Sequence, residues 1–257
     1  FQHKVKTPSY AVVEQGGVIW AYLGPKELQP PPPNFEWTLV PETHRGVSRV
    51  WQECNWLQAL EGGIDSSHAP ILHRQIREGA SSDGIQLSTP FVRGGAPTIE
   101  VDITDYGYRY TGVRPLGDKE QYVRGYHFAM PFTQLRPSQI GRAGSPDRAH
   151  VDGHHWVPID DEHTMALCFT YHPTDPLSVE QLELLREPRS GLEGLHPTVD
   201  AFEPPPAVPG TATWRTKLTH QQGFPIDWDA QNTERFSGLP GVWPQDTAMQ
   251  EGMGPIY

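Results

Sequence analysis

The chain contains 257 residues, and its 20 basic and 31 acidic side chains give a net charge of −11. This charge argues against nucleic acid or an anionic membrane surface as a partner, although a local arginine can still bind an acidic substrate. No apolar run of about 18 residues predicts a transmembrane helix, and the N-terminus does not resemble a signal peptide. The two cysteines, Cys54 and Cys168, lie in apolar surroundings typical of inert thiols, so we expect a cytoplasmic protein.

The first predicted elements are a hairpin, a linker and a strand. Residues 10–24 contain two short apolar runs around a Gly-Gly pair, which predicts a β-hairpin. Residues 25–33 end in four consecutive prolines and are expected to form a stiff extended connection. Residues 46–53 alternate well enough for a strand that leads into the next segment.

Residues 54–74 (CNWLQALEGGIDSSHAPILHR) are predicted to be mostly helical. Apolar side chains recur there at three- and four-residue steps, at Trp56, Leu57, Leu60 and Ile64. Asn55 is placed to cap the helix. Pro70 lacks a backbone donor and clashes with the preceding turn, so we expect the helix to break or widen at that residue.

The rest of the chain reads as a β-meander with short helices. Strands are expected at 98–104, 106–113, 121–130, 149–158 and 164–171, because β-rich runs are separated by turn residues. A capping box predicts a helix at 178–186. Residues 187–244 show little periodicity, and a helical turn is expected at 246–252. Together these elements predict an α+β domain in which a curved antiparallel sheet grips a long helix, with a pocket between the layers.

The predicted helix carries three polar groups that are costly to bury unless something binds them, namely Asp65, His68 and His73. Two imidazoles and a carboxylate from elsewhere make the facial triad that binds ferrous iron and leaves positions open for dioxygen and substrate. Asp65 precedes His68 by three residues and could accept a proton from its second ring nitrogen. With 12 histidines in the chain, however, an H-x4-H pair also arises readily by chance.

Residues 55–68 and 72–74 closely resemble the iron-binding segment of Rieske-type aromatic-ring oxygenases. The resemblance is to α subunits of the phthalate 4,5-dioxygenase-like branch, whose pattern D-x-x-H-x4-H is matched by Asp65, His68 and His73. The segment around Asp246 resembles the one that carries the family's third ligand. Residues 9–25 and 157–162 are also similar to the family, so the likeness covers most of the chain.

This resemblance implies a helix-grip fold of the START/Bet v1-like type. It divides the chain into the end of a Rieske-domain region (1–24), a proline-rich linker (25–45) and a catalytic iron domain (46–257). Neither cysteine begins the C-x-H or C-x-x-H pair that a Rieske [2Fe–2S] cluster requires in this family. We therefore expect that the cluster domain is missing, and that the chain is clipped at both ends of a longer subunit.

The implied function is that of a mono- or dioxygenase in which His68, His73 and Asp246 bind mononuclear Fe(II). The iron would use O2 to oxidise an aromatic substrate, with electrons from the Rieske cluster of a neighbouring subunit passing across Asp65. A ring-shaped homotrimer and a separate NAD(P)H-dependent reductase are also implied. The branch suggests an aromatic carboxylate as substrate, by analogy.

Four residues are candidates for substrate contacts. Glu61 and Gly62 precede the ligand turn and are expected to face the pocket, where the glycine would leave room for substrate. Arg124 and Arg136 lie in or beside predicted strands, and a guanidinium binds a carboxylate bidentately. The alternative is that each arginine pairs with a surface acid.

Two other functions stay open at this point. His150 and Asp152 form an H-x-D pair that, with His220, could begin the iron site of a different Fe(II) dioxygenase, although such pairs arise readily by chance. A helix-grip domain could also bind an apolar ligand without chemistry. Three polar groups at ligand spacing would have no role in such a carrier.

Overall fold

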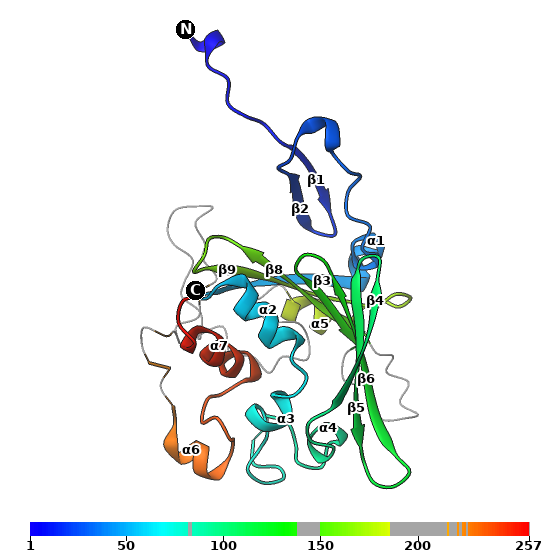
Figure 1. Cartoon of the computed structure of the whole chain (residues 1–257), viewed down its shortest axis with the longest axis vertical. Helices are drawn as coiled ribbons and strands as arrows, with labels where there is room; N and C mark the ends of the chain where they lie inside the picture. The colour runs from blue at the N-terminus through cyan, green and yellow to red at the C-terminus, as the bar shows by residue number, and fades with distance from the viewer. Residues whose placement is uncertain are drawn as a thin grey trace.

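The computed structural model describes residues 1–81, 84–137, 150–185, 215, 220, 223, 224 and 226–256. Its centre is a seven-stranded antiparallel sheet in the order β3-β9-β8-β7-β6-β5-β4. The strands are β3 (Arg45–Gln52), β4 (Thr98–Thr104), β5 (Gly107–Pro115), β6 (Gln121–Ala129), β7 (Thr133–Pro137), β8 (Val151–Pro158) and β9 (Thr164–Tyr171). Figure 1 shows the sheet curving around the helices that carry the site.

Short helices complete the described part of the chain. The α-helices are α1 (Glu36–Leu39), α2 (Trp56–Ile64), α3 (Ala69–Leu72), α4 (Pro90–Arg93), α5 (Val179–Leu185), α6 (Trp228–Thr233) and α7 (Val242–Gly252). Three 3-10 turns occur at Gln2–Lys4, Lys26–Leu28 and Glu42–His44. No helix among the described residues is long and apolar enough to cross a membrane.

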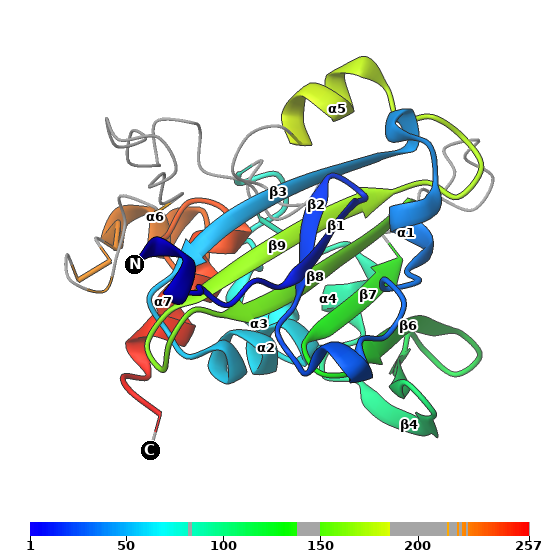
Figure 2. The ribbon, with the colours of Figure 1, turned by 90° about the horizontal axis from the view of Figure 1, so that it is seen from above.

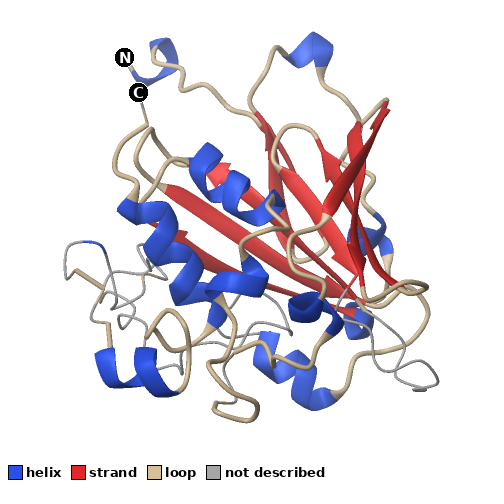
Figure 3. Ribbon diagram, turned by 60° about the horizontal axis from the view of Figure 1, so that its bottom comes forward, coloured by secondary structure: helices blue, strands red, loops and turns tan. Residues whose placement is uncertain are grey.

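The inner face of the sheet packs against α2, which also contacts α7. Since side chains alternate along a strand, one set of residues on β8 and β9 faces these helices. The resulting core contains Val50, Cys54, Ala59, Leu60, Phe128, Trp156, Ala166, Cys168 and Trp243. Figure 3 shows the two helices side by side on this face, so the arrangement is the expected helix grip.

The outer face of the sheet is covered by a separate two-stranded hairpin and by α1. The hairpin is formed by β1 (Ala11–Gln15) and β2 (Val18–Tyr22), as the Gly-Gly pair predicts. Figure 2 shows it lying over β8 and β9. There Trp37 stacks on Phe169 at 4.5 Å between ring centroids, and Trp20 approaches the buried His155 at 5.7 Å. This second core fixes the linker against the sheet.

The predicted long helix is two helices. Asn55 caps α2 as expected, in a capping box with Gln58. However, α2 already ends at Ile64, and a non-helical turn of three residues separates it from His68. Pro70 lies in the first turn of α3, where a missing N–H is tolerated, so it begins a helix rather than bending one. The position of the predicted break was therefore wrong.

Other differences are small. Strand β7 has only five residues and lacks a distinct pattern, and it was not predicted. The helix around Asp246 begins four residues earlier than expected, at Val242. The stretch 187–244 contains α6 and the start of α7. Most of residues 187–222 lie outside the described residues, as does residue 186 at the end of the predicted helix.

Candidate metal centre

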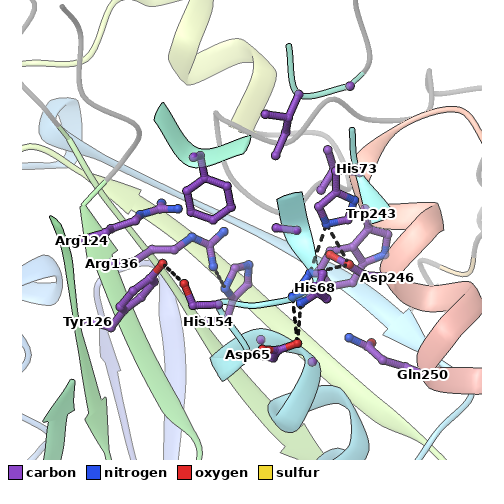
Figure 4. Close-up of a pocket in the computed structure, with 18 of the residues that line it drawn as sticks. Asp65, His68, His73, Arg124, Tyr126, Arg136, His154, Trp243, Asp246 and Gln250 are labelled. Carbon is purple, nitrogen blue, oxygen red and sulfur yellow. Dashed lines mark hydrogen bonds and ion pairs between the residues drawn. The ribbon is translucent and has the colours of Figure 1, made fainter. Parts of the chain in front are cut away.

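Three side chains from two distant parts of the chain converge next to the α2–α3 turn. His68 precedes α3, His73 follows it, and Asp246 projects from α7. His68 Nε2 and His73 Nε2 lie 3.2 and 3.1 Å from Asp246 Oδ1, and the two nitrogens lie 3.2 Å apart. Figure 4 shows the three side chains pointing at one another. Within the described part of the chain they form the one group of at least three His, Cys, Asp or Glu residues with metal-site spacing.

The second nitrogen of each imidazole has a hydrogen-bond acceptor. Gln245 donates its amide Nε2 to the Leu239 carbonyl at 2.8 Å, so its Oε1 is left to accept from His73 Nδ1, also at 2.8 Å. Asp65 Oδ2 lies 3.2 Å from His68 Nδ1. Both Nδ1 atoms therefore act as donors, and both Nε2 lone pairs point into the triangle.

Three acceptors in van der Waals contact repel one another unless a cation lies among them. Three ligand atoms on one face of an octahedron, each about 2.1 Å from the metal, would lie roughly 3.0 Å from one another. This spacing is close to the distances between the two Nε2 atoms and Oδ1. The residues thus fit a metal ion with two nitrogen ligands and one oxygen ligand. The helix break makes this geometry possible, because residues five apart on a regular helix diverge by about 140°.

The side chains of this triangle shift one another's pKa values. Burial lowers the pKa of His68, but hydrogen bonds to Asp246 and Asp65 outweigh burial and raise it to about 10. Burial would raise the pKa of Asp246, yet the nearby charges and hydrogen bonds of His73 and His68 hold it well below its usual range. Both shifts show that this position favours positive charge beside the Asp246 carboxylate.

Asp65 organises the turn as well as the ring. Its carboxylate accepts from the backbone N–H groups of Ser67 at 2.7 Å and His68 at 3.1 Å. The hydrogen bond with His68 is the main cause that lowers the pKa of Asp65 to about 2. Asp65 is thus ionised at neutral pH and fixes both the ring and the backbone of His68.

A cavity of about 430 Å³ adjoins the triangle. The indoles of Trp156 and Trp243 form part of its wall, and Arg124 and Arg136 reach it from the sheet. Figure 4 shows both arginines on the opposite side of the view from His73 and Asp246. The cavity therefore places an aromatic, partly cationic surface beside the three ligand candidates.

The arginines are held by neighbouring groups. Arg136 Nη1 lies 3.1 Å from His154 Nδ1 and 3.4 Å from Gln134 Oε1, and Arg124 Nη2 donates to the Pro137 carbonyl at 3.0 Å. Gly62 lines the cavity, but Glu61 is exposed and is not among the lining residues.

The H-x-D pair does not form a second centre with the distal histidine. Asp152 is buried, accepts a hydrogen bond from Thr170 and lies 3.5 Å from His150 Nε2. The backbone of His220 instead donates to Glu251 on α7. Among the described residues these groups form no cluster of metal-site spacing.

The sequence analysis did not single out Gln245, which orients His73, or His154, which lines the cavity. It named His150 only as part of the H-x-D pair, whereas the structure places His150 in the cavity wall. The position of Gln245 directly before the expected ligand Asp246 was the available signal. An amide side chain is common on any helix, so this signal was not specific.

A protein-family model described as LigXa C-terminal domain like matches residues 21–183, more than half of the chain. The chain belongs to this family. This match and the two relatives described next together confirm the predicted relationship to Rieske-type oxygenase α subunits, including phthalate 4,5-dioxygenase.

Named relatives of this LigXa C-terminal-like chain are oxygenase subunits. It is 32% identical over 259 residues to the 3-chlorobenzoate-3,4-dioxygenase oxygenase subunit of Comamonas testosteroni, covering 100% of this chain and 57% of the relative. It is 30% identical over 276 residues to the phthalate 4,5-dioxygenase oxygenase subunit of Pseudomonas putida, covering 98% and 54%. The chain thus spans a little over half the length of these relatives.

Among solved structures, dicamba monooxygenase bound to dicamba matches with a TM-score of 0.48 and 16% identity. The match covers 64% of this chain and 50% of that structure.

Proposed function

We propose that this chain is the catalytic part of a Rieske-type oxygenase that binds mononuclear Fe(II) and oxidises an aromatic substrate carrying a carboxylate. The observation that supports this most directly is the triangle of three acceptor atoms, with edges of 3.1–3.2 Å, beside a cavity. His68, His73 and Asp246 would bind the iron. With three protein ligands, ferrous iron keeps open positions and supplies the activation of dioxygen.

The remaining residues of the site would orient ligands and substrate. Gln245 and Asp65 hold the Nδ1 protons of the two imidazoles, so that each Nε2 lone pair stays directed at the metal position. Trp156 and Trp243 offer flat surfaces for an aromatic ring. Arg124 and Arg136 would bind the carboxylate and thereby set which end of the substrate points toward the ligands.

The complete enzyme would need partners. The relatives are named as oxygenase subunits, which supports a multi-component system. We propose that electrons come from the [2Fe–2S] Rieske cluster of a neighbouring subunit in a homotrimer, supplied by an NAD(P)H-dependent reductase. In this division residues 1–24 close the cluster domain, 25–45 are the linker and 46–257 form the catalytic domain. Two buried free thiols, Cys54 and Cys168, favour a cytoplasmic location.

Anaerobic metal analysis tests the proposed iron site. Wild-type chain should bind about one Fe(II) per chain, and Asp246→Ala should lose it, because two imidazoles alone leave the cation without its anionic ligand. Thr247→Val, a change at the next buried position of α7, serves as the matched control and should keep iron. Full occupancy in Asp246→Ala would contradict the assignment of the carboxylate. A wild-type chain that binds apolar compounds but no iron would be a carrier instead.

Tryptophan fluorescence tests the substrate class, because two of the eight tryptophans, Trp156 and Trp243, line the cavity. Benzoate should quench it, and Arg124→Lys or Arg136→Lys should weaken benzoate binding about tenfold, since lysine keeps the charge but loses the planar fork. Benzamide has a similar shape without the charge, so its weaker affinity should be unchanged by either substitution. Equal benzoate affinities in wild type and both variants would remove the arginines from the proposal.

A further inference from the structure

The turn between α2 and α3 carries Asp65 and leads into His68, yet it lies outside both helices. Where a helix stops, its last carbonyl groups have no partner within the helix and need other donors. Buried carbonyls without donors are costly, so the donors here decide how firmly the turn is held.

Side chains from the sheet supply these donors. Gln134 Nε2 on β7 donates to the Gly63 carbonyl, and Tyr110 Oη on β5 donates to the Ile64 carbonyl, both at 2.8 Å. Arg114, also on β5, donates through Nη2 to the Ser66 carbonyl and, at 3.0 Å, to the Ser66 hydroxyl. The turn is thus tied to β5 and β7 of the sheet through three side chains.

Arg114 differs from the other donors because it carries a charge and is completely buried. Its guanidinium forms no ion pair with a carboxylate among the residues that the structure describes, and Nη1 has no hydrogen-bond partner there. The ring of Phe91 lies 3.9 Å from its central carbon, and burial lowers the pKa of Arg114. Burying a charge without a carboxylate costs free energy. A neutral donor would avoid this cost, so arginine at this position must make contacts that a neutral donor cannot make.

The geometry that requires arginine is a bridge between two walls of the cavity. While Nη2 binds Ser66, Nε donates at 2.8 Å to the carbonyl of Gly95, just after α4. Only a guanidinium presents several N–H donors in one rigid plane. Lysine or glutamine could not donate to Ser66 and to Gly95 at the same time in this fixed orientation. The α2–α3 turn and the end of α4 therefore keep a constant spacing through this one side chain.

We propose that Arg114 is a positioning residue for the metal centre, acting through Ser66 on Asp65 and His68. This inference rests on the proposed iron site. Ser66 directly follows Asp65, whose carboxylate holds the backbone and the ring of His68. A rotation of the turn at Ser66 would therefore move Asp65 and His68 together and open the triangle with Asp246.

The test is binding of Co(II) to the full chain after it has been stripped of metal. Titration gives the affinity, and the visible absorption spectrum reports the geometry around the bound ion. Arg114→Met should weaken Co(II) binding about 10- to 100-fold and change the spectrum, as does the loss of other groups that orient metal ligands without touching the metal. Arg114→Lys should fall between wild type and Arg114→Met. Ser66→Ala removes the hydroxyl, and with it the contacts to Arg114 and to Tyr126 Oη at 3.0 Å, but keeps the Ser66 carbonyl that Arg114 binds. It should weaken binding by about threefold to tenfold and provides the test if the arginine variants do not fold.

Thr164→Val is the matched control, because Thr164 is also buried and donates at 2.8 Å to a carbonyl of the same region, that of Cys54 before α2. It should lower the melting temperature but leave Co(II) affinity within twofold of wild type. Loss of global stability does not change the affinity of chains that remain folded, whereas a displaced ligand does.

Wild-type affinity and spectrum in folded Arg114→Met, or in Ser66→Ala if Arg114→Met is unfolded, would overturn the inference. An equal loss of affinity in Thr164→Val would overturn it too, because the effect would then be general. Failure of the proposed function looks different: the wild-type chain would bind no Co(II), or Asp246→Ala would bind it equally well.

Discussion

At the scale of single residues, Asp65 shows how one carboxylate can serve structure and chemistry together. It caps the turn through two backbone N–H groups and also binds the ring of His68. Its side chain is 43% exposed, whereas that of His73 is 3% exposed. Asp65 therefore lies at the border between the metal candidates and the surface.

Asp65→Asn separates these roles. The amide oxygen can replace Oδ2 and accept from the backbone and the ring of His68, while the N–H of Ser67 loses its acceptor. The turn should therefore persist in a weaker form, and iron should stay bound. A neutral partner polarises the imidazole less, and we expect product formation by the complete oxygenase to fall about 10- to 100-fold. Iron content and product formed in a single turnover measure the two effects separately. Wild-type turnover in this variant would exclude Asp65 from the electron path.

At the scale of elements, the site depends on how closely α2 approaches the sheet. Gly63, near the end of α2, lies directly against the ring of Trp156 on β8, and a Cβ at this position would overlap that ring. Trp156 is 2% exposed and packed in the inner core, so it cannot easily move away. The glycine thus sets the distance at which α2 ends and the ligand turn begins.

Gly63→Ala should consequently lower the free energy of unfolding by about 1–3 kcal/mol, even though alanine favours a helix, because overpacking against a fixed ring dominates. Urea denaturation measures the change. Gly125→Ala is the control, since a Cβ there meets no atom within 4 Å, and it should be close to neutral. A Gly63→Ala chain as stable as wild type would show that Trp156 or α2 yields at little cost.

At the scale of the whole molecule, a buried acid links the end of α7 to the segment between β3 and α2. Glu251 is 4% exposed and accepts from the backbone N–H of Glu53 at 2.9 Å. Burial raises the pKa of Glu251 to about 7, although hydrogen bonds from Glu53 and His220 oppose the shift. In the unfolded chain its pKa would be near the ordinary glutamate value of about 4.3.

Between these two pKa values the folded state binds more protons than the unfolded state, so the Glu251 contribution to stability falls as pH rises from about 4.3 to 7. Glu251→Gln keeps an acceptor for Glu53 and removes the charge. This variant should be more stable than wild type at pH 8, by about 3–4 kcal/mol, and the difference should disappear near pH 4. Urea denaturation across this pH range is the measurement. A difference that does not depend on pH would mean that Glu251 titrates normally in the folded chain.

The sequence by itself determined most of the strands and the local part of the site. Alternation and turn residues predicted the hairpin and the meander because side chains on a strand repeat every two residues. The resemblance to known oxygenases identified Asp65, His68 and His73 within nine residues, and it also pointed to Asp246. Spacing could not have paired Asp246 with them, since 178 residues separate it from His68.

Tertiary structure decided which groups surround those residues. At the break before His68, side chains from β5 and β7 donate to the last carbonyl groups of α2. A prediction based on Pro70 alone therefore placed the break too late in the chain. Successive residues of a helix point about 100° apart, which is why Gly62 lines the cavity while Glu61 faces solvent. Arg114 becomes significant only once the sheet sets it behind Ser66. Local sequence encodes periodicity and capping, whereas contacts between distant segments exist only after the helices pack into the sheet.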